Sequence, residues 1–296
     1  TQGMMAGLLS VLKKKPFVYN LQDIFPDSLV NSGMTSKESV VWKIGRVIED
    51  YGYRHATKII VISEDFKKNI MEKGVPEEKI VVVSNWADVK GVYPVKRKDN
   101  ILVERYGLDP DKFYITYCGN IGFTQNMDML LEVAKLIENE MLDVRFLLIG
   151  EGAAKEAVVD RINTEKIGNV ITLPFQPYED IAHVFSLGDV GLIISKPGVG
   201  NNSVPSKTWS IMAAGRPILA SFDSDSELSK IIKFSKCGVC AEAGNKEQFI
   251  EQIRSLISSS EQRNRMGVNG KNYIENNLNK EKCVSEYIEV LEKTKG

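Results

Sequence analysis

The chain has 296 residues, of which 43% are hydrophobic and 26% charged, and its formal net charge is -1. This length predicts two domains of similar size, each able to bury its own core. The lysines and arginines are scattered rather than gathered in the basic stripe that nucleic-acid binding requires, so nucleic acid is not an expected partner. The sequence shows neither an apolar run of about 18 residues nor a signal peptide, so a cytoplasmic location is expected.

The first 15 residues read as a helix that precedes a strand, with no initiator Met and no strand before it. We therefore expect the chain to be a fragment. Lys13, Lys14 and Lys15 follow the apolar stretch "MMAGLLSVL". Two interpretations of these lysines stay open: a peripheral contact with an anionic membrane, or the solvated end of a helix.

Three short runs rich in β-branched residues, 17–21, 58–63 and 79–84, predict strands in the first part of the chain. Between the first two, residues 36–56 carry Val40, Ile44, Val47 and Ile48 near helical spacing after a candidate capping serine. Strands joined by helices predict a parallel sheet with crossover connections. We assign residues 1–100 to this first, incomplete domain.

Residues 86–111 are charged and poorly periodic, with Pro94 and Pro110 as breakers, and predict the domain boundary. Six candidate strands alternate with helices after it, which favours a doubly wound, Rossmann-like domain over residues 101–278. Residues 279–296 predict a helix that packs back on the first domain. The six strands are 113–119, 144–150, 169–174, 190–195, 217–221 and 238–243.

Cys237 and Cys240 have the spacing of a thioredoxin-like redox pair. Such a pair normally opens a helix, whose N-terminus lowers a thiol pKa. Here the pair lies on a strand that follows a helix, so reduced core cysteines are the better interpretation. His55 and His183 are too isolated to suggest a metal site or a catalytic triad.

Ligands of open α/β sheets bind where the strands end, and two loops of the second domain stand out there. The first, "GNIGFTQ", contains Gly119, Asn120, Gly122 and Gln125. Its glycines allow the backbone to turn tightly and to approach a ligand. A turn without a ligand is the alternative.

The second loop leads into "VPSKTWSIMAAGRPILAS", residues 204–221, where Pro205 and Gly215 predict a helix over 205–214. Its first turn would leave the N–H groups of Ser206, Lys207 and Thr208 without intrahelical acceptors. Three donors beside a lysine, with no carboxylate in the segment, predict a phosphate site. A solvated lysine at a water-capped helix start is the alternative.

In chain order, "VYNLQDIFPDSL", "GNIGFTQNMDMLLEVAK", "FLLIGEG", "VITLPFQPYEDIAHVFSLGDVGLIIS" and "VPSKTWSIMAAGRPILAS" resemble glycosyltransferase family 4, in particular bacterial O-antigen and capsule enzymes of the fucosamine-transferase type. The resemblance covers nearly the whole chain. It implies the GT-B fold, in which two Rossmann-like domains face each other, the second holding the nucleotide sugar and the first the acceptor. It implies no metal and no cofactor besides the donor substrate.

The sequence departs from this family at several positions. Asn202 and Ser210 stand where most members have two glutamates, for the sugar hydroxyls and the ribose. Asn120 and Gln125 stand where members usually offer Arg and Lys to the diphosphate, and Gln22, before Asp23, where many have a histidine facing the sugar. The family's first strand and glycine-rich loop have no counterpart here. Lys207 is thus the cation that we expect beside the phosphates.

The resemblance implies a retaining transferase of hexosyl or N-acetylhexosaminyl type, using a UDP-sugar rather than a GDP-sugar. Its acceptor would be a glycan or a polyprenyl-linked glycan of surface polysaccharide synthesis, met at the inner face of the cytoplasmic membrane. Two alternatives remain: a fragment that binds a nucleotide sugar without transfer, and a GT-B epimerase. Lys207 is the expected catalytic residue, and Gln22 and Asp23 the acceptor-side residues. The expected donor-binding residues are Gly119, Asn120, Gly122, Gln125, Pro174, Phe175, Gln176, Asn201, Asn202, Ser203, Val204, Pro205, Ser206, Lys207, Thr208 and Ser210.

Overall fold

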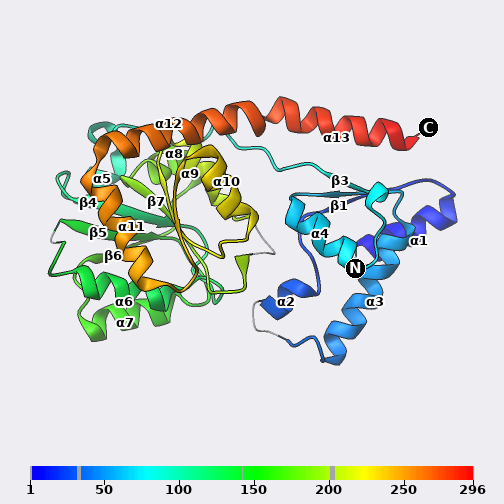
Figure 1. The fold of residues 1–296 in the computed structure, drawn as a ribbon, viewed down its shortest axis with the longest axis horizontal. Helices are drawn as coiled ribbons and strands as arrows, with labels where there is room; N and C mark the ends of the chain where they lie inside the picture. Colours follow the sequence, from blue (N-terminus) through cyan, green and yellow to red (C-terminus); the bar gives the residue numbers. More distant parts are fainter. Residues whose placement is uncertain (1, 32–34, 142, 201–203, 296) are drawn as a thin grey trace. The chain divides into compact units, whose positions relative to one another are not determined.

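The structure, a computed structural model, describes residues 2–31, 35–141, 143–200 and 204–295 (Figure 1). These residues form two compact units. Unit 1 runs to Trp86 and includes the C-terminal segment from Lys280, and unit 2 contains Ala87–Gly200 and Val204–Asn279. Both units hold parallel strands joined by helices, so the predicted α/β class is confirmed.

Unit 1 is built on a three-stranded parallel sheet in the order β1-β2-β3, as the three β-branched runs predict. Side chains that alternate along β2 point to opposite faces of this sheet. Ile59 and Val61 pack with Phe66 of α4, whereas Ile60 packs with Val290 of α13. Its elements are α1 (Gln2–Lys13), β1 (Val18–Leu21), α2 (Asp27–Asn31), α3 (Val40–His55), β2 (Lys58–Val61), α4 (Glu64–Glu72), a 3-10 turn (Glu77–Lys79), β3 (Ile80–Val82) and α13 (Lys280–Lys295).

Serine side chains cap the N-termini of α3 and α4 in unit 1. Ser39 accepts a hydrogen bond from the N–H of Trp42 at the start of α3, and Ser63 accepts one from Phe66 at the start of α4. Each serine satisfies one backbone donor that the helix itself cannot. The capping residue expected near position 36 is therefore Ser39.

Unit 2 is built on a six-stranded parallel sheet in the order β6-β5-β4-β7-β8-β9, and all six predicted strands are confirmed. The chain moves outward from β4 to β6, then returns to the other side of β4 for β7 to β9. This reversal is typical of a doubly wound sheet. The strands are β4 (Phe113–Cys118), β5 (Val144–Ile149), β6 (Val170–Leu173), β7 (Val190–Ile194), β8 (Ile218–Ser221) and β9 (Gly238–Ala241).

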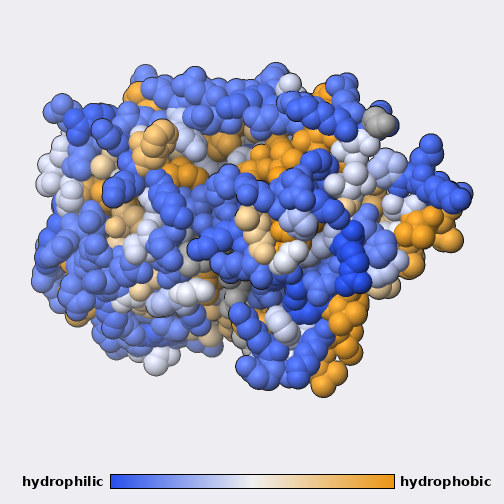
Figure 2. All heavy atoms as spheres, turned by 45° about the vertical axis from the view of Figure 1, so that its right-hand side comes forward, coloured by the Kyte–Doolittle hydropathy of each residue, from blue (hydrophilic) through white to orange (hydrophobic). Residues whose placement is uncertain are grey.

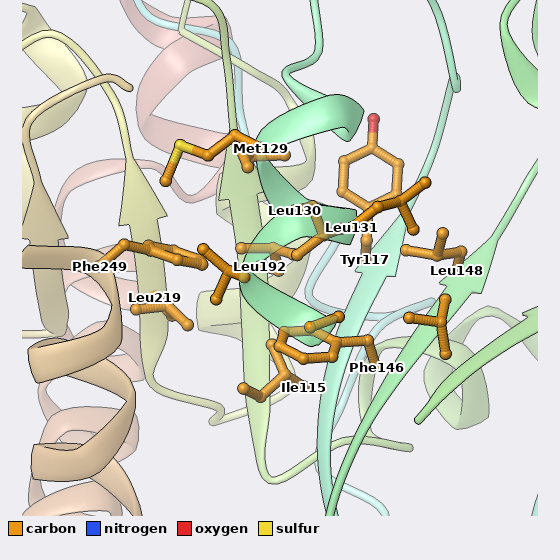
Figure 3. Packing of buried hydrophobic residues seen from close by; sticks show 14 of the residues in the cluster. Ile115, Tyr117, Met129, Leu130, Leu131, Phe146, Leu148, Leu192, Leu219 and Phe249 are labelled. Atoms are coloured by element: carbon orange, nitrogen blue, oxygen red, sulfur yellow. The ribbon is translucent and has the colours of Figure 1, made fainter. Parts of the chain in front are cut away.

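Helices cover both faces of the unit 2 sheet. Figure 3 shows one face, where Leu130 and Leu131 of α6 meet Tyr117 and Leu148 of the sheet. Helices α6 (Met127–Ile137), α7 (Lys155–Glu165) and α11 (Lys246–Ser258) cover this face. The other face is covered by α5 (Ile101–Arg105), α8 (Ile181–Phe185), α9 (Lys207–Ala213), α10 (Glu227–Ser235) and α12 (Ser260–Asn277); 3-10 turns lie at Arg97–Asp99 and Tyr178–Asp180.

The segment between the two sheets belongs to unit 2. The N–H of Ala87 donates to the Leu278 carbonyl at 2.9 Å, and the N–H of Val95 donates to the Ser186 hydroxyl at 3.0 Å. The units therefore divide after Trp86, whereas sequence composition places the boundary at residue 100. Pro94, read as a breaker, lies in an extended stretch on unit 2.

Cys237 lies directly before β9 and Cys240 within it, and burial raises the pKa of both thiols. A redox pair needs a lowered thiol pKa, so their surroundings fit core cysteines. Within the described ranges, no helix combines the length and the apolar character that crossing a bilayer demands.

Candidate functional site

The candidate site lies where β4 and β7 run side by side in unit 2. Ile115 pairs with Val190 and Thr116 with Gly191. Because the chain order of the sheet reverses between these two strands, the loops that follow them diverge and leave room for a ligand. The loop after β4 holds Gly119, and the segment after β7 leads to Lys207.

Glycine is required where the loops after β4 and β5 touch. Gly119 and Gly150 have φ angles of +138° and +147°, which residues other than glycine rarely adopt. A Cβ on Gly150 would collide with the Gly119 carbonyl oxygen, and a Cβ on Gly119 would lie 3.2 Å from Lys207 Nζ. The loop backbone thus comes directly against the lysine.

Lys207 is the first residue of α9, and its ammonium group lies over an aromatic ring. Its Nζ is 3.8 Å from the ring centroid of Tyr117, a cation–π arrangement. Burial lowers the pKa of Lys207 to about 8, and burial also raises the pKa of the neighbouring Cys118 thiol to about 11. The thiol is therefore neutral at pH 7. Among the residues that the structure describes, no carboxylate lies in salt-bridge range of Lys207.

The start of α9 differs from the prediction in one respect. The N–H of Thr208 donates to the Pro205 carbonyl at 2.9 Å, and the N–H of Trp209 donates to Ser206 at 3.1 Å. The expectation that the Thr208 N–H is free is therefore wrong, and the assignment of Thr208 to donor binding stays a prediction. Since α9 has 7 residues, its dipole is small and the lysine supplies most of the positive charge.

The other predicted residues of the first loop mainly hold the loop itself. The Gln125 side chain accepts the N–H of Gly122 at 2.9 Å, which closes the turn. The carbonyl of Asn120 accepts the Tyr117 hydroxyl at 2.5 Å, while the Asn120 side chain is exposed. Asn120 thus remains available to a ligand, and Gln125 does not without breaking the turn.

The loop after β6 lies two strands away from β4, and its predicted residues differ in exposure. Gln176 is buried and hydrogen-bonded to the Tyr106 hydroxyl and to the Pro174 carbonyl, both at 2.7 Å. Pro174 is exposed, and Phe175 is 72% exposed. Of these residues, Phe175 presents a ring to solvent, and Gln176 fixes the loop that carries it.

The remaining predicted donor-binding residues lie within positions 201–203 or shortly after them. Asn201, Asn202 and Ser203 lie outside the described residues. Val204 packs partly against the core, Pro205 and Ser210 are half-buried, and Ser206 is exposed. The Ser206 side chain can therefore reach a ligand beside Lys207.

Asp223, which follows β8, is a residue that sequence reasoning missed. Its carboxylate accepts the N–H groups of Gly198 at 2.9 Å and of Gly200 at 2.7 Å, and it is buried. The same segment is tied to the first loop, because the N–H of Lys196 donates to the Thr124 carbonyl at 2.9 Å. Asp223 thus fixes the chain that leads into the Lys207 loop. The sequence signal that could have identified Asp223 is its position just after the carboxyl end of a predicted strand.

In unit 1, the predicted acceptor-side residues lie at the end of β1. Gln22 donates to the Asn20 side chain at 2.7 Å and accepts from Asn85 at 2.8 Å. Tyr287 of α13 lies within 3.4 Å of the same amide group. Asp23 is exposed. The network orients Gln22, and neither Asn85 nor Tyr287 was expected from the sequence.

Across the parts of the chain that the structure describes, His, Cys, Asp and Glu side chains form no group of three or more that could hold a metal ion. The positive charge at the end of the β4 strand comes from Lys207.

Two family models match this chain. Residues 99–273 match the glycosyl transferases group 1 model, and residues 1–86 match the glycosyl transferase 4-like domain. The chain belongs to the group 1 glycosyl transferases. The glycosyltransferase family expected from the motifs is confirmed, and the fucosamine-transferase type stays a prediction.

Two relatives of this chain are named as glycosyltransferases, and one of them is named for colanic acid biosynthesis. The probable glycosyltransferase WbjE of Pseudomonas aeruginosa is 30% identical over 73% of this chain and 53% of the relative. The putative colanic acid biosynthesis glycosyl transferase WcaI of Escherichia coli K12 is 25% identical over 95% of this chain and 69% of the relative. The chain thus spans about half to two-thirds of the length of these relatives.

Solved structures share the fold. The Anabaena protein Alr3699/HepE in complex with UDP superimposes with a TM-score of 0.82 at 15% identity, over 98% of this chain and 76% of that chain. The structure of its complex with UDP-glucose gives a TM-score of 0.80 at 16% identity, over 98% of this chain and 76% of that chain. At this identity the likeness concerns the fold, and it confirms the predicted GT-B architecture.

Proposed function

We propose that this group 1 glycosyl transferase moves a sugar from a nucleotide-diphosphate sugar to a glycan acceptor of surface polysaccharide synthesis. One observation carries the proposal. Lys207 Nζ lies over Tyr117 and against the Gly119 backbone, without a carboxylate partner in the described part of the chain. A partly desolvated cation without a counter-ion favours binding of an anion. The donor's diphosphate supplies that anion.

The lysine would act on the leaving group. When the bond between the sugar and the diphosphate breaks, negative charge increases on the departing phosphate. The Tyr117 ring and the Gly119 backbone hold Lys207 in place before the reaction, so its ammonium group stabilises this charge with little reorganisation. Losing one such donor typically raises the barrier by about 3 kcal/mol. Lys207 is therefore the residue to which we assign catalysis, in place of a metal ion.

We further propose a UDP-sugar of hexosyl or N-acetylhexosaminyl type as the donor, with retention at the anomeric carbon. The UDP complexes of the Anabaena protein support the choice of base. Retention follows from the family resemblance. Phe175 would border the base, because it is an exposed aromatic ring after β6. Asn120, Ser206 and the segment 201–203 would meet the diphosphate and the sugar.

The acceptor that we propose is a glycan or a polyprenyl-linked glycan at the inner face of the cytoplasmic membrane. The Escherichia coli relative, which is named for colanic acid biosynthesis, supports a role in polysaccharide synthesis. On the acceptor side, Gln22 is fixed by Asn20 and Asn85, and the exposed Asp23 carboxylate is available to a sugar hydroxyl. The specific sugar that we propose for transfer is an aminodeoxy sugar of the fucosamine class.

A thermal-shift screen of nucleoside diphosphates and their sugars tests the proposal. A bound ligand stabilises the folded protein by about 3 kcal/mol when its concentration is about 100 times its Kd. We expect UDP and one or more UDP-sugars to raise Tm by several degrees and GDP to have a smaller effect. A screen in which no nucleoside diphosphate raises Tm would contradict the proposal.

A further inference from the structure

The loop that carries Phe175 runs from β6 into the 3-10 turn Tyr178–Asp180. Its middle is held by the buried Gln176, which bonds to the Tyr106 hydroxyl at 2.7 Å. The Phe175 ring itself is 72% exposed. The place of this ring therefore depends on the contacts that hold the loop.

Tyr178 gives the loop a second attachment. Its hydroxyl donates to the Asp88 carboxylate, whose other oxygen accepts the N–H of Gly91 at 2.9 Å. A Cβ on Gly91 would collide with the Asp88 carboxylate and with the Tyr178 hydroxyl, so glycine is needed for this close approach. The loop after β6 is thus tied to residues 87–95, with which unit 2 begins.

Residues 87–95 are themselves fixed on unit 2, so they offer the loop a firm anchor. The Ser186 hydroxyl donates to the Tyr93 carbonyl at 3.1 Å. The Arg216 guanidinium donates to the Val95 carbonyl at 3.0 Å. Since these bonds engage the backbone of the segment, the segment stays in place when the loop after β6 moves.

The same segment also contacts the helix that carries Lys207. Val92 is buried in one small cluster with Ala213 and Ala214, at the end of α9, and α9 begins at Lys207. Residues 87–95 therefore touch two elements of the donor side, the helix of the proposed phosphate contact and the loop of the proposed base contact.

The bond between Tyr178 and Asp88 adds little to the stability of the fold. Tyr178 is 65% exposed and Asp88 is also exposed, on a protein whose surface is mostly hydrophilic where Figure 2 shows it. Water competes for both groups, so the net contribution of the bond to the free energy of unfolding is small. The bond instead restricts the loop. An aromatic ring that is already held in place costs less entropy to order when a ligand binds.

We propose that Tyr178 and Asp88 are positioning residues for the nucleobase of the donor. Their bond holds the loop so that the Phe175 ring is in place before the nucleotide binds, whereas separate contacts hold Lys207. Binding of the base then depends on Tyr178 and Asp88, and binding of the diphosphate depends on Lys207. This inference rests on the proposed function, which assigns the base to Phe175.

Calorimetric titrations of the whole chain with UDP and with inorganic pyrophosphate separate the two contributions. We expect Tyr178→Phe to raise the Kd of UDP about fivefold, as for the ordering of one aromatic side chain, and to leave Tm and the Kd of pyrophosphate unchanged. Lys207→Ala should raise both Kd values. Tyr93→Phe is the matched control and should change neither, because Tyr93 is 51% exposed in the same segment and its hydroxyl bonds to none of the described residues.

A double-mutant cycle tests whether the two side chains act together. Asp88→Ala, alone or combined with Tyr178→Phe, should raise the Kd of UDP by the same factor of about five as Tyr178→Phe alone. Hydrogen exchange measures the loop without any ligand. The amides of Phe175, Gln176 and Tyr178 should exchange faster in Tyr178→Phe than in the wild type.

Three results would overturn this inference alone, provided that Lys207→Ala still weakens binding. They are an unchanged Kd of UDP in Tyr178→Phe, equal losses for UDP and pyrophosphate, and additive losses in the double-mutant cycle. A wild-type chain that binds neither ligand would overturn the proposed function as well.

Discussion

At the residue scale, Lys207 combines two features that oppose stability in the free protein. Its ammonium group is partly removed from water, which lowers its pKa to about 8, and no described carboxylate compensates the charge. Tyr117 offers part of the compensation through its ring face. A diphosphate bound between Lys207 and Gly119 would supply the rest, so ligand binding and lysine protonation are coupled.

This coupling predicts a pH dependence of UDP affinity. Below pH 8 the lysine is protonated in both the free and the bound protein, so the affinity should change little. Above pH 8 the free lysine loses its proton while the bound diphosphate keeps it protonated. Kd should then rise up to tenfold per pH unit. Calorimetry in two buffers of different ionisation enthalpy should show proton uptake near pH 9, and an affinity that is flat up to about pH 10 would speak against the role of Lys207.

At the scale of elements, the segment after β7 depends on β8 through Asp223. Asp223→Ala removes the acceptor of the Gly198 and Gly200 N–H groups. We expect the free energy of unfolding to fall by about 2 kcal/mol. UDP affinity should fall severalfold as well, because the segment leading to Lys207 is released. Urea denaturation and calorimetry measure the two effects.

Ser224→Ala serves as the control for Asp223→Ala, since Ser224 is the exposed neighbour of Asp223. Ser224→Ala should leave the free energy of unfolding and the UDP affinity unchanged. If Asp223→Ala lowers stability but binds UDP as tightly as the wild type, the carboxylate supports the fold alone and the assigned link to the site is wrong.

The strands were predictable from sequence because β-branched runs between helical segments have few other interpretations. The rule that ligands bind at strand ends led to Gly119 and Lys207. The position of Tyr117 under Lys207 and the bonds of Asp223 were not predictable, because they join residues far apart in the sequence. The spacing of Val40, Ile44 and Val47 predicted a helix correctly, but periodicity alone does not say whether a stripe faces the core or the outside.

The turn at the start of α9 shows a similar limit. Proline at position 205 favours a helix start, and the chain does turn there. The turn is tighter than an α-helix, since Thr208 bonds to the carbonyl three residues earlier. Trp209 and Ile211, which follow this turn, are buried in the core, and the segment's own sequence does not reveal which residues they pack against.

At the scale of the whole molecule, each unit has its own sheet and its own core. The clusters around Ile59 and Ile60 belong to unit 1, and those around Leu130, Leu147 and Ile218 belong to unit 2. All described residues of the donor-side site lie in unit 2, whereas Gln22 and Asp23 lie in unit 1. We therefore propose that unit 2 binds the donor and that unit 1 binds the acceptor.

The measurement that tests this account most directly is a calorimetric titration of UDP into the wild-type chain, Lys207→Ala and Lys233→Ala. Lys233 is an exposed lysine of α10 and serves as the matched control. We predict that the wild type and Lys233→Ala bind UDP with the same Kd, and that Lys207→Ala raises Kd at least tenfold, as expected for a lost charge-assisted contact of about 1.5–3 kcal/mol. Equal Kd values for Lys207→Ala and the wild type would contradict the account.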